Sequence, residues 1–165
     1  MMLTSSCSGS SRSGGAPSQL VSTFIGHLLA TGFVQSHIAD TLQPAYARRH
    51  RILSSAVREY LLPLSVTFDE ADKAGVAGGY FLWLRLPPGM KASELARKAK
   101  EEENVLISEG SIFGVEGDET LNKGSERDLE GFIRICFAWE EESLLEEGVK
   151  RLARLIGREK DVLKR

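Results

Sequence analysis

The pattern of apolar and polar residues predicts a helical first part, followed by a part in which short strands alternate with helices. Between Gln19 and Ala30, apolar residues recur at steps of three and four, which predicts an amphipathic helix. We expect Ser36 to cap a second helical segment that runs toward Leu62. Pro44 interrupts this segment, because proline removes one helical hydrogen bond and clashes with the preceding turn. A kink or a new helix start is therefore expected at Pro44.

The period of the pattern changes after this helical part. Residues 64–68 alternate between apolar and polar, which predicts a half-buried strand. Residues 78–86 predict a second strand that pairs antiparallel with the first. A short charged helix over 93–103 and a small strand at 105–107 come next. An amphipathic helix over about 142–160 ends this part of the chain.

Residues 131–139 form the most apolar strand-like run of the chain. The β-branched and aromatic residues predict a largely buried strand with Ile133 and Ile135 on one face and Arg134 on the other. Arginine keeps its charge at neutral pH, so Arg134 needs an anion. That anion is either a carboxylate of the same chain or a ligand carboxylate, which the planar guanidinium grips with two parallel hydrogen bonds. On spacing alone the internal ion pair is favoured, because charged groups inside sheets are more often paired internally.

The composition is that of an ordinary globular protein, with 165 residues, 42% hydrophobic and 27% charged. A net charge of -2 gives no reason to expect nucleic acid or an anionic membrane as a partner. The two cysteines, Cys7 and Cys136, lack the spacing of a metal site or a disulfide framework, and the three histidines are too far apart for a helical metal pair. No apolar run spans a membrane and no signal peptide is recognised, so we expect a soluble cytoplasmic protein without a metal site.

The chain is expected to divide into three parts. Residues 1–17 are rich in serine and glycine and predict a flexible tail. Residues 18–62 form the helices, and residues 63–165 form one small domain. The fold class is α/β, with a few mixed or antiparallel strands covered by helices on one side.

Three further expectations concern charged and aromatic side chains. Trp83 and Trp139 lie in predicted strands and are expected in the core. The arginines at positions 48, 49 and 51 recur at helical spacing, so we expect them on a solvated face. The acidic residues 140–142 fall in a first helical turn, where the helix dipole favours negative charge without any catalytic role.

The central strand (132–138), the acidic helix start (140–142) and the amphipathic run after it (144–156) resemble the C-terminal end of class I/II aminotransferases. These are pyridoxal-phosphate enzymes of the aspartate aminotransferase type, and the resemblance is closest to the 2-aminoadipate and valine-pyruvate aminotransferase-like branch. In that family, the arginine of the matching strand binds the α-carboxylate of the substrate. The resemblance thus assigns this role to Arg134.

Three other segments are similar to the same family. Ser13, Gly14 and Gly15 resemble a Gly-Gly segment near the subunit interface, which makes them candidate cofactor contacts. The Gly-Gly-aromatic-Phe pattern within 78–86 is typical of the aminotransferase small domain. Residues 108–114 resemble a "Val-x-x-Pro-Gly-x-x-Phe" loop at the mouth of the active site, although a glutamate replaces the proline.

The resemblance implies pyridoxal 5'-phosphate as cofactor, an amino acid and a 2-oxo acid as substrates, and a homodimer in the complete enzyme. The family's Schiff-base lysine lies in a Ser-x-x-Lys motif, and no lysine of this chain is preceded by serine at that distance. We therefore expect no catalytic residue in this chain, which corresponds to the last third to two-fifths of a full enzyme. The chain alone is expected neither to bind the cofactor covalently nor to transaminate.

Two alternatives stay open. A lyase or synthase with the same fold would use the same arginine for the same carboxylate. A non-catalytic interaction module would instead pair with complete copies through the apolar faces of the helices at 19–62. Whether this chain by itself is an enzyme is left open by the sequence.

Overall fold

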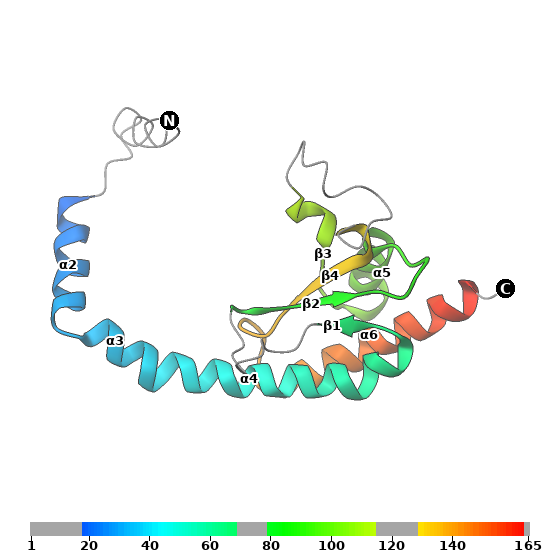
Figure 1. Ribbon diagram of the computed structural model, residues 1–165, viewed down its shortest axis with the longest axis horizontal. Coiled ribbons are helices and arrows are strands. Elements are labelled where there is room, and N and C mark those ends of the chain that lie inside the picture. The colour runs from blue at the N-terminus through cyan, green and yellow to red at the C-terminus, as the bar shows by residue number, and fades with distance from the viewer. Residues whose placement is uncertain (1–17, 69–78, 115–128, 164–165) are drawn as a thin grey trace, which may run out of the picture. The chain divides into compact units, whose positions relative to one another are not determined.

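The computed structural model of the chain describes residues 18–68, 79–114 and 129–163 (Figure 1). The chain divides into two compact units, Met1–Pro44 and Ala45–Arg165. The predicted tail at 1–17 lies outside the described residues. No helix among the described residues is both long and apolar enough to cross a membrane.

The first unit contains the helices α2 (Gln19–Ala30) and α3 (Phe33–His37). The Ser18 side chain accepts a hydrogen bond from the backbone N–H of Val21, so it caps α2 as an N-cap serine does. The expected cap at Ser36 is wrong. The chain turns instead at Gly32, whose φ of 76° suits glycine, and α3 starts directly after it.

Pro44 lies in the first turn of α4 (Gln43–Ala56), as expected for a new helix start. A π-helical turn (Ile38–Leu42) precedes α4, and the wider turn provides room where proline cannot donate a hydrogen bond. A second π-helical turn (Val57–Leu61) and a 3-10 turn (Leu62–Leu64) continue from α4.

The second unit is built on an antiparallel sheet with the strand order β1-β2-β4-β3. The strands are β1 (Thr67–Phe68), β2 (Phe81–Arg85), β3 (Ser108–Glu109) and β4 (Phe132–Cys136). The antiparallel pairing of β1 with β2 confirms the sequence prediction. Two predictions of strand position are wrong. The first strand starts only at Thr67, because the 3-10 turn and the left-handed Ser65 occupy 62–65, and the small strand lies at 108–109 instead of 105–107.

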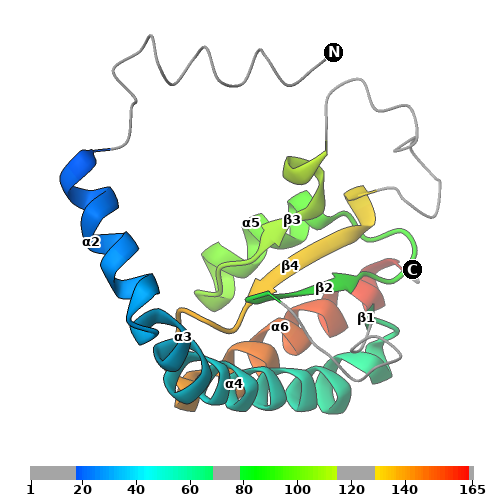
Figure 2. The same cartoon turned by 60° about the vertical axis from the view of Figure 1, so that its left-hand side comes forward.

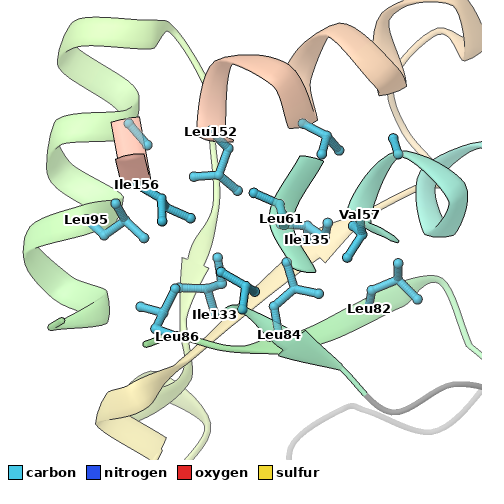
Figure 3. Packing of buried hydrophobic residues seen from close by; sticks show 14 of the residues in the cluster. Val57, Leu61, Leu82, Leu84, Leu86, Leu95, Ile133, Ile135, Leu152 and Ile156 are labelled. Atoms are coloured by element: carbon cyan, nitrogen blue, oxygen red, sulfur yellow. The ribbon is translucent and has the colours of Figure 1, made fainter. Parts of the chain in front are cut away.

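One face of the sheet is covered by α4 with its π-helical extension, by α5 (Ala92–Glu103) and by α6 (Glu142–Leu163), as Figure 2 shows. In Figure 3, apolar side chains of these helices point toward Leu84 and Ile133 of the central strands. The buried hydrophobic residues contributed by the helices are Leu53, Ala56, Val57, Leu61, Ala92, Leu95, Ala99, Leu145, Val149, Leu152, Leu155 and Ile156. The α/β fold class, with an antiparallel sheet and helices on one side, is confirmed.

The alternation of the two central strands decides what the opposite face carries. Leu82 and Leu84 of β2 and Ile133 and Ile135 of β4 are buried in the core. The residues between them consequently point to the other face, on which none of the helices α4, α5 and α6 packs. Arg134 lies on this open face.

Candidate carboxylate-binding site

Arg134 lies at the centre of the open face of the sheet. The side chain of this arginine is directly opposite Trp83 on β2 and opposite Ser108 on β3. In an antiparallel sheet, directly opposed residues point to the same face, so these three side chains form one row across three strands. The strand thus presents the arginine to the side away from the core, as the sequence predicts.

The guanidinium of Arg134 is held by two phenyl rings. Its central carbon lies 3.8 Å from the ring centroid of Phe81 and 4.0 Å from that of Phe113. Both distances are well within the range of cation–π attraction. Phe81 belongs to β2, whereas Phe113 belongs to the 3-10 turn η4 (Gly110–Phe113). Two separate elements therefore meet at this one charged group.

The internal ion pair that spacing alone favours is not found in the described part of the chain. None of the ion pairs between residues 18–68, 79–114 and 129–163 involves Arg134. Its Nε atom is buried and has no hydrogen-bond partner among these residues. Because Nε is buried, a ligand carboxylate would meet the Nη donors at the end of the guanidinium, which have no acceptor among the described residues either.

Trp83 supports this arrangement from the side. Its ring meets that of Phe113 edge-on, with centroids 5.3 Å apart and planes inclined by 75°. Phe81, Trp83 and Phe113 are 37%, 38% and 37% exposed. The expectation that Trp83 belongs to the core is wrong, because the register of β2 places it on the open face.

The turn η4 is fixed against the sheet by Gly110. A Cβ atom at this position would lie 2.5 Å from the carbonyl oxygen of Leu129 and 3.0 Å from the Cβ atom of Phe132. Only glycine allows so close an approach. The segment 108–114 is the one that resembles the loop at the family's active-site mouth, and its Phe113 contacts Arg134.

Sequence reasoning missed Phe81 and Phe113 as neighbours of Arg134. A signal for Phe81 was present, because alternation places it on the face opposite to the buried Leu82. The signal for Phe113 was only the family-like loop, whose position relative to the sheet no local pattern gives. The candidate cofactor contacts Ser13, Gly14 and Gly15 lie outside the described residues.

Arg48 and Arg51 of α4 are exposed, as the solvated-face prediction expects, whereas Arg49 is not. Arg48 forms a two-pronged hydrogen bond with the Glu142 carboxylate, at 2.9 Å from Nε and 2.8 Å from Nη2. These hydrogen bonds lower the pKa of Glu142 and raise the pKa of Arg48. Arg49, which is mostly buried, donates to the carbonyl oxygen of Phe137. Arg48 therefore connects α4 to the first residue of α6, and Arg49 connects α4 to the segment between β4 and α6.

A groove of about 590 Å³ lies beside the end of β4 and does not include Arg134. The strand end, the segment 104–107 and the first turns of α6 form its walls. Trp139, which was expected in the core, is 91% exposed at this groove, because β4 ends at Cys136. No cluster of metal-ligating side chains occurs among the residues that the structure describes.

Several lysines of the described segments have partners within the chain. Lys98 and Lys150 are bound to Glu159 and Glu146, and Lys160 donates to the carbonyl oxygen of Leu64. A Schiff-base lysine must lose its proton readily, whereas the hydrogen bond to Glu146 raises the pKa of Lys150.

Comparisons with known proteins show which family this chain is similar to. The family profile described as aminotransferase class I and II matches residues 9–152. An uncharacterized protein of Saccharomyces cerevisiae, YER152C, is 39% identical over 111 residues, which cover 67% of this chain and 24% of that protein. The 2-aminoadipate transaminase of Thermus thermophilus is 34% identical over 79 residues, which cover 48% and 17% of the two chains.

Solved structures show the same fold. The α-aminoadipate aminotransferase LysN of Thermus thermophilus matches with a TM-score of 0.64 and 25% identity. The match covers 84% of this chain and 31% of the LysN chain. The kynurenine aminotransferase of Pyrococcus horikoshii also has a TM-score of 0.64 and 25% identity, covering 80% and 28%. The matched part of this chain spans 17–26% of the length of the curated relatives that it matches.

Proposed function

This chain belongs to the class I and II aminotransferase family, and we propose that it supplies the substrate-carboxylate site of a pyridoxal-phosphate-dependent aminotransferase. In this proposal Arg134 binds the α-carboxylate of an amino acid or of the matching 2-oxo acid. The observation that carries the proposal is the guanidinium on the open face of the sheet, stacked on two phenyl rings and without a carboxylate partner among the described residues.

The chemistry of the site supports this choice. A guanidinium presents parallel N–H groups that match the two oxygens of a carboxylate, and this pairing fixes the orientation of the ligand as well as its position. Orientation is what an amino acid needs before its Cα–H bond can react, because a reacting bond must be aligned with the groups that act on it. A lysine ammonium at the same place would give charge without this orientation.

The cofactor and the assembly belong to the proposal as well. The Pyrococcus horikoshii relative is described in complex with PMP, and LysN in complex with a phosphopyridoxyl leucine. We infer that a complete protein of this kind uses pyridoxal 5'-phosphate and acts as a homodimer. Because no lysine of this chain has the Ser-x-x-Lys context, we expect the chain alone to show no transaminase activity.

The test is a chimera in which this chain replaces the matched C-terminal segment of the Thermus thermophilus 2-aminoadipate transaminase. Arg134→Ala should lower kcat/KM for amino acid substrates about 100-fold, since removing one partner of a charged hydrogen-bonded pair costs about 2–5 kcal/mol. Arg134→Lys should recover only part of this loss, because the ammonium cannot form two parallel hydrogen bonds.

Arg85→Ala is the matched control in the same chimera. Arg85 also lies on the open face, and its guanidinium carbon lies 5.7 Å from the ring centroid of Phe132. Its removal should change kcat/KM by less than about threefold if the effect of Arg134 is specific. An active chimera whose kcat/KM is the same with and without the Arg134 guanidinium would exclude Arg134 from the site.

A second candidate function is supported by α2. No residue of this helix is buried, and Leu20 and Phe24 are 65% and 61% exposed. Contiguous apolar surface of this kind marks a protein contact in soluble proteins. The alternative is therefore a non-catalytic module whose helices at 19–62 pair with another polypeptide.

Sedimentation of the purified chain tests the alternative. Phe24→Glu should lower self-association or association with a complete aminotransferase subunit, while the polar control Thr23→Glu should leave it unchanged. If both variants associate as strongly as the unmodified chain, α2 is not part of an interface.

A further inference from the structure

We propose that Phe81 and Phe113 are positioning residues that fix the plane of the Arg134 guanidinium, so that a planar carboxylate is accepted only along its N–H edge. We call these two residues the aromatic clamp. The inference rests on the proposed function, since it concerns how the same arginine meets its carboxylate. It assigns a role to two side chains that carry no reacting group.

The geometry of the clamp is that of stacking. The guanidinium carbon is 3.8 Å from the centroid of the Phe81 ring and 4.0 Å from that of the Phe113 ring. A ring at this distance covers one side of a guanidinium, so rings from two different elements enclose it. The arginine therefore has little freedom to rotate unless one ring leaves.

The rings, and not hydrogen bonds, set the orientation of the arginine. Its buried Nε atom has no acceptor among the described residues, and no ion pair among these residues involves its guanidinium. If carboxylates of the chain oriented the arginine, they would compete with the ligand carboxylate for its N–H groups. Stacking avoids this competition, because it uses the weakly hydrated faces of the guanidinium and leaves the Nη donors at its end for the ligand.

The surroundings keep the clamp in place. Phe81 is held in β2, which pairs with β4 over five residues. Phe113 contacts Trp83 edge-on at 5.3 Å, and its turn is anchored at Gly110. The clamp is thus preorganised before the ligand arrives, which reduces the entropy lost on binding.

The experiment uses the 165-residue chain and two readouts. The first is the NMR resonance of the Arg134 Nε–Hε group, assigned by its loss in Arg134→Lys. Ring currents from two stacked phenyls should move this resonance upfield, and Phe113→Leu should reverse much of the shift. The second readout is the affinity for 4-methylpentanoate, with uncharged 4-methylpentanamide as the matched control ligand.

Phe113→Leu should weaken 4-methylpentanoate binding about three- to tenfold, while Phe113→Tyr should keep the affinity of the unmodified chain. Phe81→Leu should act in the same direction. In the Arg134→Ala background, Phe113→Leu should have no further effect, because the ring acts through the arginine. The thermal midpoint of Phe113→Leu checks that the chain remains folded.

The outcomes separate the two proposals. If Arg134→Ala loses the carboxylate but Phe113→Leu and Phe81→Leu bind it as tightly as the unmodified chain, the positioning role is wrong and the proposed function stands. An Nε–Hε resonance without an upfield shift also overturns the clamp. If the unmodified chain binds acid and amide equally, or Arg134→Ala binds the acid unchanged, the proposed function itself fails.

Discussion

Replacing Gly110 by alanine should destabilise the second unit and loosen the turn that carries Phe113. The added Cβ would lie 2.5 Å from the Leu129 carbonyl oxygen and 3.0 Å from two atoms of Phe132, distances below ordinary van der Waals contact. The colliding atoms include backbone, so the strand start and the turn must move apart. Overpacking of this kind costs about 1–3 kcal/mol. For a unit of this size we expect the thermal midpoint to fall by about 5–15 °C.

Gly148→Ala is the matched control, because the same methyl group is added where nothing lies within 4 Å. Gly148 is inside α6, where alanine is favoured over glycine by about 0.5–1 kcal/mol. The midpoints of urea and thermal unfolding, followed by circular dichroism, should therefore fall for Gly110→Ala and rise for Gly148→Ala. If Gly110→Ala unfolds at or above the midpoint of the unmodified chain, the close approach of η4 to the start of β4 is refuted.

Three other predictions concern the core, its pH dependence and a surface ion pair. Leu84→Ala should lower the free energy of unfolding by about 2–5 kcal/mol in urea titrations, because the side chain is fully buried, whereas the exposed control Leu106→Ala should change it by less than about 0.5 kcal/mol. Burial, followed by the charge of Arg58, lowers the pKa of His50 below its ordinary value of 6.5, so the unfolded chain binds this proton more readily. Stability should then fall as the pH drops below 6.5, and His50→Gln should flatten that part of the unfolding-midpoint profile. Lys98→Met should lower the unfolding midpoint only a little, because the ion pair between Lys98 and Glu159, whose atoms lie 2.7 Å apart, keeps both side chains about a quarter exposed and contributes about 1 kcal/mol. A large loss in low-salt calorimetry would contradict this.

The sequence alone was sufficient to predict the elements whose signal lies in a local pattern of residues. Steps of three and four residues predicted α2 and most of α6, and Ser18 caps α2 as its side chain favours. Where local signals competed, the prediction was wrong. The residues after α4 alternate like a strand, but Pro63 and the left-handed Ser65 produce a 3-10 turn there, so β1 starts late.

Exposure of single aromatic residues depended on where strands end and on what covers them. Trp139 follows an apolar strand, yet β4 ends three residues earlier and leaves its side chain in solvent. Trp83 lies within a strand, but on the face that no described helix covers. An apolar residue is buried only if another element packs on it, and no local pattern contains that information.

The alternation of residues 132–136 by itself determined that Ile133 and Ile135 face the core and that Arg134 faces away, because successive side chains of a strand point to opposite sides. Only the tertiary structure decided what meets Arg134 there. Antiparallel register places Trp83 beside it, and long-range packing brings Phe81 and Phe113 to within 4.0 Å of its guanidinium carbon. Such contacts join residues far apart in the chain, so they follow from the packing of whole elements and not from the spacing of their side chains.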